Sequence, residues 1–389
     1  MRKNKDYVFT SESVTEGHPD KIADGISDSV LDAVLKEDKN SRVACETMTG
    51  NGYVLVGGEI TSKADPDITE IAREKIKRIG YKDSEYGFDF KSIAVFDALN
   101  SQSKDIARGV RKTGSERQGA GDQGMMTGFA CSETEEAMPL PIVLAHKITK
   151  RMAEKRREKL PFLRPDGKSQ VSVKYRGFKP VSVPSVVVAA QHDPGIEEKK
   201  LKEAIIEEVI RPVCGEYLTE QTKFHINSTG RFVKGGPAAD CGLTGRKIVV
   251  DTYGGMAHVG GGCFSGKDPT KVDRSGAYMT RYAAKNVVEA GLAERCEIQV
   301  AYAIGVPDPV SININCFGTV NKDEFPGLTE AKIKKAVRNS FDFRAGMIIR
   351  NLNLLKPIYE KTSAYGHFGR GEFSWEKTNK VEKLQSVIS

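Results

Sequence analysis

The sequence lacks the features of disulfide-rich, zinc-binding and membrane-spanning proteins. Its seven cysteines form no C-x-x-C pair, and its six histidines form no H-x-x-x-H pair. An odd, dispersed set of cysteines argues against a disulfide framework and a zinc site. The longest apolar run, near 181–190, is interrupted by Pro184, so no segment is expected to span a bilayer. The N-terminus has no apolar core typical of a signal peptide, and we therefore expect a cytoplasmic protein.

The sequence also lacks the signs of a covalent nucleophile. It contains no G-x-S-x-G motif, and neither a Ser-His-Asp nor a Cys-His pairing is evident. We therefore expect a reaction between two bound ligands, in which the protein positions the reactants and stabilises the charge of a leaving group.

Length and net charge bear on the number of domains and on the kind of partner. A chain of 389 residues predicts two or three domains. The net charge of +7 indicates an anionic partner, and nucleic acid is one alternative. The dense basic run at 147–159 has few aromatic residues beside it and is more typical of a solvated helix face. We therefore expect no nucleic-acid partner.

A glycine-rich stretch, 251–286, brings cations and carboxylates together. Its glycines permit tight bends and the close approach of a ligand. They are followed by charged side chains, namely Lys267, Asp268, Lys271, Asp273 and Arg274. A polyphosphate with its divalent metal requires this combination of groups.

The match of 261–267 to G-x-x-x-x-G-K does not make this stretch a P-loop. Asp268 stands where that motif needs a Ser or Thr hydroxyl for magnesium. The sequence predicts a phosphate-binding loop of another kind, with Asp268 and Pro269 starting a helix. A surface loop with solvated lysines is the alternative.

A second phosphate-and-metal candidate lies near the N-terminus. Pro19 is well placed to begin a helix, which puts His18, Asp20 and Lys21 where unpaired backbone N–H groups favour anions. A simple helix cap is the alternative reading of this turn.

Further candidates lie in predicted turns and strands. A turn near 163–173 presents Asp166 and Lys168. The segment 227–247 carries charges and a ring that could stack on a base, namely Arg231, Phe232, Asp240, Arg246 and Lys247. Glu46 and Glu59 lie in two strands predicted at 43–60, where each is either solvated or paired inside a site.

Two features of the sequence concern the organisation of the chain into domains and loops. The polar segment 101–121 has no hydrophobic periodicity, which is typical of disorder or of a functional lid. Strand, polar connection and amphipathic helix recur at 53–79, 185–210 and 310–337, which predicts three related α/β units.

Three motifs together resemble the bacterial S-adenosylmethionine synthetases. They are G-H-P-D-K at 17–21, G-A-G-D-Q-G at 119–124 and G-G-G-C-F-S-G-K-D-P-T-K-V-D-R-S at 260–275, and the similarity extends over about 7–373. The resemblance implies an α+β fold of three similar α/β domains around a pseudo-threefold axis, with sheets packed centrally and helices outside. The expected units are 1–103, 119–236 and 237–389, with a mobile gating loop at 104–118.

The resemblance also implies a reaction. The methionine sulfur attacks C5′ of ATP in line and displaces triphosphate, which is then hydrolysed to phosphate and diphosphate. Two magnesium ions per active site and one potassium ion per subunit are expected. The expected assembly is a homotetramer, a dimer of dimers with active sites at the dimer interface.

The family's functional residues map onto matching positions of this chain. The expected triphosphate-binding residues are His18, Lys168, Arg246, Lys247 and Lys267. The expected further ATP contacts are Asp166 for ribose, Arg231 and Phe232 for adenine, Asp240 and Cys263. The expected methionine contacts are Glu59, Gln102, Asp240 and Lys271. The expected metal ligands are Asp20 and Asp273 for magnesium and Glu46 for potassium. Lys104 stands where relatives carry proline, which predicts a less restricted loop.

Overall fold

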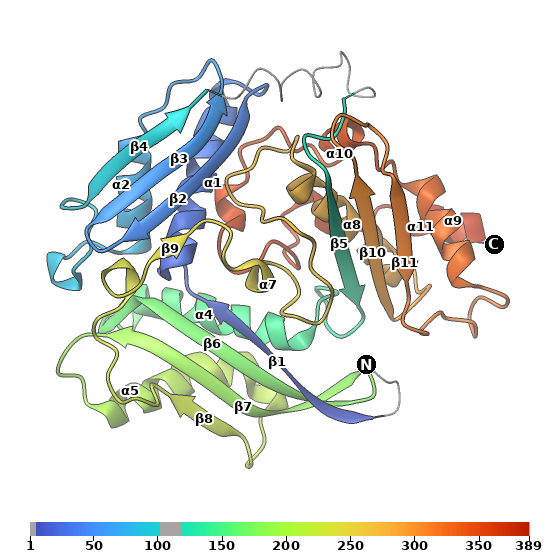
Figure 1. The fold of residues 1–389 in the computed structure, drawn as a ribbon. Coiled ribbons are helices and arrows are strands. Elements are labelled where there is room, and N and C mark those ends of the chain that lie inside the picture. The colour runs from blue at the N-terminus through green and yellow to red at the C-terminus, as the bar shows by residue number, and fades with distance from the viewer. Residues whose placement is uncertain (1–4, 102–117, 389) are drawn as a thin grey trace.

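The computed structural model describes residues 5–101 and 118–388, and these form three units with the same order of parts (Figure 1). Each unit has a strand, a long helix, an antiparallel hairpin and a second helix. The long helices are α1 (Pro19–Glu37), α4 (Leu140–Glu158) and α8 (Val272–Glu289). The predicted threefold recurrence of strand and helix is confirmed.

The other elements complete the three units. The first adds β1 (Asp6–Val14), β2 (Arg42–Gly50), β3 (Tyr53–Thr61), α2 (Ile68–Ile79) and β4 (Ala94–Asn100). The second adds β5 (Gly124–Cys131), β6 (Leu163–Arg176), β7 (Lys179–His192), α5 (Glu198–Ile205), the π-helical turn η2 (Ile206–Ile210), α6 (Arg211–Cys214) and β8 (Lys223–Ile226). The third adds β9 (Gly242–Leu243), α7 (Ile248–Asp251), β10 (Arg295–Tyr302), β11 (Ser311–Asn315), α9 (Glu330–Ser340), α10 (Ala345–Asn351) and α11 (Val381–Ile388).

The units are interlocked because each gives its first strand to the next sheet. Strand β1 of the first unit pairs with β6, and β5 of the second pairs with β10. Strand β9 of the third unit pairs with β2 and closes the ring. The sheet orders are therefore β4-β3-β2-β9, β1-β6-β7-β8 and β11-β10-β5. The boundaries predicted at 1–103, 119–236 and 237–389 stay a prediction.

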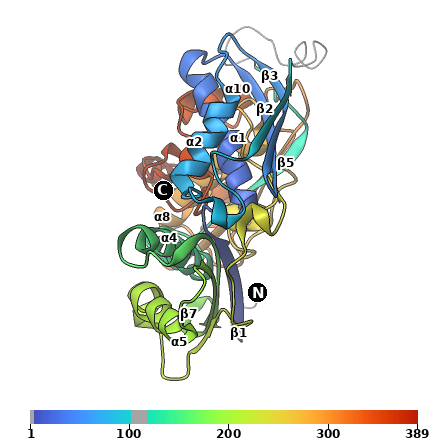
Figure 2. The same ribbon diagram turned by 90° about the vertical axis from the view of Figure 1, so that its left-hand side faces the viewer.

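The sheets and helices form two sides of the molecule. Figure 1 shows the three sheets around a central group of loops, and Figure 2 shows the helices on one side of them. Helices α1 and α2 cover the first sheet, α4 the second and α8 the third. The expected α+β class is confirmed, and α1, α2, α4 and α8 leave the opposite side of the sheets uncovered. None of the helices in the described ranges is long and apolar enough to cross a membrane.

The turn predicted around Asp166 and Lys168 is wrong. Both residues lie inside β6, where Lys168 is aligned with Val14 of β1 and Ala189 of β7. Hydrogen bonding to a strand on each side overrides the turn preference of the P-D-G sequence. The local irregularity survives only as a shift in register beside Gly167.

The helix predicted to start at Asp268 and Pro269 begins instead at Val272. The Asp268 carboxylate accepts hydrogen bonds from the backbone nitrogens of Val43 at 2.8 Å and Thr270 at 2.9 Å. The Asp268 carboxylate therefore attaches its own loop to β2. These hydrogen bonds replace the helix N-cap expected at this position.

A fully buried ion pair joins the first and third units. Arg274 of α8 donates to the two carboxylate oxygens of Asp28 in α1 at 2.7 and 2.9 Å. The same guanidinium donates to Thr362 Oγ1 at 3.0 Å and lies over the Tyr359 ring at 4.2 Å. These contacts satisfy a charge pair that would otherwise be costly to bury.

We expect Arg274→Met to destabilise the fold strongly, because it leaves the Asp28 carboxylate buried without its counter-charge. Breaking such a pair costs roughly 3–5 kcal/mol. The measurement is the shift in urea and thermal unfolding midpoints. Arg211→Met is the control, because its exposed pair with Glu207 contributes only about 0.3–0.5 kcal/mol. Equal shifts in the two variants would contradict the assignment.

Candidate active site

A column of carboxylates along α1 positions the loops of the candidate site. The four residues recur every fourth position and so lie on one helix face: Asp20, Asp24, Asp28 and Asp32. Each accepts a hydrogen bond from a backbone nitrogen more than 200 residues away. In the same order, the donors are Leu243, Gly245, Gly266 and Tyr359, at 3.0, 2.8, 2.8 and 2.9 Å. Helix α1 thus fixes three distant loops.

Two of the donors must be glycine. Gly245 and Gly266 have φ of +80° and +79°, which side-chain-bearing residues rarely adopt. A Cβ on Gly245 would meet the Cys263 side chain, and one on Gly266 would overlap the Cys45 carbonyl oxygen. The glycine richness of these loops therefore permits their close approach to the column and to β2.

The first group of site residues surrounds the start of α1 and is built around His18, Asp20, Lys168 and Lys247. His18 is the N-cap, 2% exposed, and its Nδ1 accepts a hydrogen bond from the Asp20 backbone nitrogen at 3.2 Å. Burial, together with Lys247 and Lys168 nearby, lowers the pKa of His18 to about 3. The ring is therefore neutral at pH 7, and with Nδ1 acting as acceptor it carries its proton on Nε2.

Asp20 is the carboxylate of this first group. It forms an ion pair with Lys247 and accepts from the Leu243 nitrogen. Burial opposes its ionisation, but these two partners outweigh burial and lower the pKa of Asp20. Lys21, also predicted for this turn, is fully buried and pairs instead with Asp24 and with Asp251. Lys21 is therefore part of the internal support rather than a free cation.

Asp166 lies beside this group on β6 and has an unused oxygen. Its Oδ2 accepts from the Gly236 nitrogen at 2.8 Å, whereas its buried Oδ1 has no hydrogen-bond partner. Burial raises the pKa of Asp166 to about 6. Phe232 is held nearby through His192, whose Nε2 accepts from the Phe232 nitrogen at 3.1 Å. An unsatisfied buried carboxylate oxygen is suited to a hydroxyl donor from a ligand.

The second group lies between β2 and the start of α8. Lys267 pairs with Asp273 at 2.6 Å, and Cys263 and Glu46 lie close enough to influence the charge on Lys267. Burial lowers the pKa of this amine, but Cys263, Asp273 and Glu46 outweigh burial and raise it. Burial also raises the pKa of the Cys263 thiol, which disfavours its reactive thiolate.

The remaining predicted residues are placed as follows. Arg231, Asp240 and Arg246 are exposed on loops of the first group, and Glu59 is paired across the hairpin with Ala44 of β2. Lys271 pairs with buried Asp268. Gln102 and the expected gating loop at 104–118 lie outside the described residues, apart from 118.

Sequence reasoning missed the carboxylates that support the site. Asp24, Asp28 and Asp251 are buried, and they accept hydrogen bonds from Lys21, Arg274 and loop nitrogens. The available signal was the four-residue spacing of aspartates in α1, because charged residues on an apolar helix need buried partners.

The candidate metal ligands fit a metal that arrives with phosphate. Asp20 and Asp273 are hard oxygen donors, each paired with a lysine in a different group. Within residues 5–101 and 118–388, no set of three or more His, Cys, Asp or Glu side chains could hold a metal ion. Magnesium is commonly bound by one or two carboxylates with substrate phosphates, so the donor chemistry is compatible.

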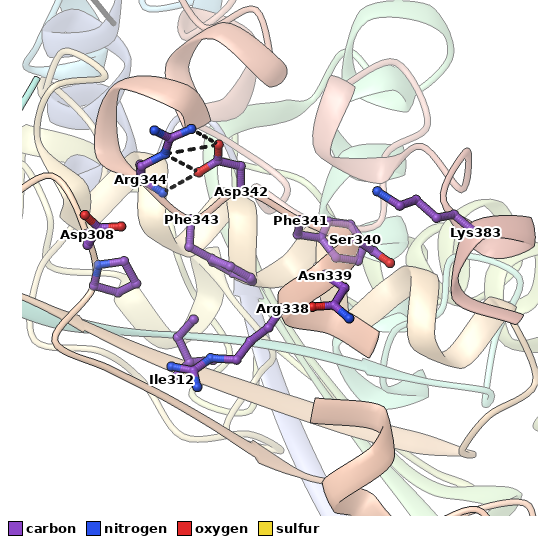
Figure 3. A pocket seen from close by; sticks show the side chains of 11 residues that line it. Asp308, Ile312, Arg338, Asn339, Ser340, Phe341, Asp342, Phe343, Arg344 and Lys383 are labelled. Carbon is purple, nitrogen blue, oxygen red and sulfur yellow. Dashed lines mark hydrogen bonds and ion pairs between the residues drawn. The ribbon is translucent and has the colours of Figure 1, made fainter. Parts of the chain in front are cut away.

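A larger hollow elsewhere is separate from these groups. A cavity of about 490 Å³ is lined by the end of α9, the loop 341–344, residues within 308–312 and Lys383 of α11, and none of its lining residues is among the predicted site residues. Figure 3 shows Asp342 paired with Arg344, and the Arg338 and Lys383 side chains on opposite sides of the pocket. Its charges therefore do not converge on one point.

Comparison with known proteins covers nearly the whole chain. Models of the N-terminal, central and C-terminal domains of S-adenosylmethionine synthetase match residues 6–104, 117–232 and 234–377. A protein of Treponema denticola named S-adenosylmethionine synthase is 56% identical over 393 residues, covering 99% of this chain and all of the relative.

We expect inorganic tripolyphosphate to bind with proton uptake by His18 at acidic pH. The polyanion would offset Lys247 and Lys168, which now help to keep His18 unprotonated, and so raise the pKa of His18 from about 3. Because the complex then binds more protons than the free protein, affinity should increase as pH falls. Calorimetry in buffers of different ionisation enthalpy measures the uptake. His18→Asn should reduce it; an unchanged uptake in that variant would assign the proton to another group.

Proposed function

The chain belongs to the S-adenosylmethionine synthetase family, and on that premise we propose that it transfers the adenosyl group of ATP to the sulfur of L-methionine. Triphosphate is displaced in line and then hydrolysed to phosphate and diphosphate. The observation that carries the proposal is the match of all three domain models along 6–377. A cytoplasmic location stays our inference from the sequence.

The cations of both groups would bind the triphosphate. A thioether has no proton to lose, so the transfer needs no general base, and stabilising the leaving chain is the main requirement. Neutral His18 would donate from Nε2, while Lys168, Arg246 and Lys247 would supply positive charge from the same group. Lys267 would do so from the second group.

The nucleoside would lie beside β6. The unpartnered Oδ1 of Asp166 would accept a hydrogen bond from a ribose hydroxyl, and burial of this carboxyl raises its pKa to about 6. Phe232 would stack on adenine, with Arg231 and Asp240 at its exposed edge. Cys263 would contact ATP from the second group.

Metal and methionine sites complete the proposal. Asp20 and Asp273 would hold two magnesium ions, and Glu46 would hold one potassium ion. Magnesium bound to the phosphates would neutralise the negative charge that develops on the leaving chain. Glu59, Gln102, Asp240 and Lys271 would bind methionine.

We infer that the active site is completed by a second copy of the chain. The strand registers place Glu46 and Glu59 on the same face of the first sheet as the exposed apolar residues Leu55 and Phe96. This face lies opposite the helices (Figure 2). Exposed large apolar residues on one face are typical of an interface. A partner covering it would bring its first group to the second group of this chain, in a dimer and then a homotetramer.

Incubation with ATP, magnesium and methionine tests the activity. We expect methionine-dependent release of phosphate and diphosphate, with a sulfonium product identified by mass spectrometry. Lys267→Ala should lower turnover about 100-fold without changing the unfolding midpoint, because it removes a cation from the leaving group. Lys335→Ala, an exposed lysine of α9, is the control. Phosphate release that does not depend on methionine would contradict the proposal.

The interface makes a separate prediction. Phe96 is 55% exposed on the uncovered side of the first sheet, and Phe96→Asp would place a charge in the interface. We expect light scattering to show monomers and the assay to show loss of turnover. Val387→Asp, at a 42% exposed position on α11, should leave both unchanged. A dimeric Phe96→Asp variant would place the interface elsewhere.

A further inference from the structure

A second cavity lies among the helices, apart from the two site groups. It has a volume of about 200 Å³ and lies between α4 and the segment 365–370. Its lining comprises Glu136, Met138, Val143, His146, Lys147, Lys150, Tyr365, Phe368, Gly369 and Arg370. None of these residues has a role in the proposed reaction, so that reaction does not explain the cavity.

The inner wall of this cavity is apolar. Met138, Val143 and Phe368 are 1%, 8% and 2% exposed, and they belong to the continuous hydrophobic core. Their fixed positions form a preformed surface for the apolar part of a ligand.

The outer edge of the cavity is cationic. Lys147 pairs with Glu136 at 2.7 Å, and Arg370 donates to Glu372 at 2.7 and 3.0 Å. Lys150 has no ion pair with any described residue and is exposed. Lys147 and Arg370 are therefore already paired with carboxylates, and the excess of positive charge at this edge is that of Lys150.

His146 adds a polar group to the wall of the cavity. Its Nδ1 lies 2.8 Å from Ser13 Oγ, while its Nε2 is buried and has no hydrogen-bond partner. Burial lowers the pKa of His146 to about 3, so the ring is neutral and adds no charge. The cavity therefore combines an apolar wall and a cationic edge, with the neutral His146 ring in its lining.

We propose that this cavity binds a small carboxylate with an apolar body. The apolar part packs against Met138, Val143 and Phe368, and the carboxylate faces the ammonium of Lys150 at the edge, which is unpaired among the described residues. The volume is below the 300–1,000 Å³ typical of pockets for drug-sized ligands, which limits the body to a single ring or a short chain.

Calorimetry with 3-phenylpropanoate and its neutral amide, 3-phenylpropanamide, tests the charge requirement on the full-length protein. The two molecules have the same apolar body, so we expect the carboxylate to bind at least tenfold more tightly. Equal affinities would overturn the proposal. Excess L-methionine should not displace 3-phenylpropanoate; displacement would place the ligand in the methionine site.

Variants then locate the bound molecule. Lys150→Ala should weaken binding about fivefold, the size expected for one exposed ion pair. Lys155→Ala is the matched control, because this lysine lies on the same helix and does not line the cavity. Val143→Phe should fill the cavity and abolish binding. Unchanged affinity in Val143→Phe, or equal effects of the two lysine variants, would overturn the assignment.

These measurements do not depend on catalysis. A protein that lacked transferase activity could still bind 3-phenylpropanoate in this cavity, and an active enzyme could fail to bind it. Failure of this proposal and failure of the proposed function are therefore distinguishable.

Discussion

The hydrogen bonds from distant backbone nitrogens to the aspartates of α1 determine where the site forms. A buried carboxylate without partners is very costly, so each aspartate of this column requires a donor. The donors come from loops around Leu243, Gly245 and Gly266, and both site groups are attached to those loops. Lys247 follows two residues after Gly245, and Lys267 directly follows Gly266. Moving the helix would therefore move both groups of cations together.

One lysine–carboxylate pair is formed in each group before any ligand arrives. Lys247 pairs with Asp20 and Lys267 with Asp273, so these two lysines and two carboxylates already have partners. In the proposed reaction, the polyphosphate and its magnesium would take both partners of each pair, with the lysine moving to phosphate and the carboxylate to the metal. Polar groups already oriented in this way would need little reorganisation when charge develops on the leaving chain.

The exchange of strands connects this local arrangement to the whole chain. Strand β9 pairs with β2 at Met48 and Thr49, next to the position where Leu243 donates to Asp20. The same pairing closes the ring of three units. With the helices gathered on one side, the opposite side of the sheets carries both apolar residues and candidate ligands such as Glu46 and Lys168. The fold thus places apolar residues and candidate ligands on the same side of the sheets.

The sequence by itself determined the residue types that the chemistry needs, the family and the threefold recurrence of strand and helix. It identified the helix at Pro19 because proline and a four-residue apolar period are local signals. Only the tertiary structure decided that Asp268 fastens a loop to β2 and that Asp166 lies within a strand. It also separated Lys21, which is fully buried, from Lys247, which is partly exposed beside Asp20. The physical reason is that these roles depend on partners more than 80 residues away, such as Val43, β1 and Asp251, whose approach leaves no periodic trace in the sequence.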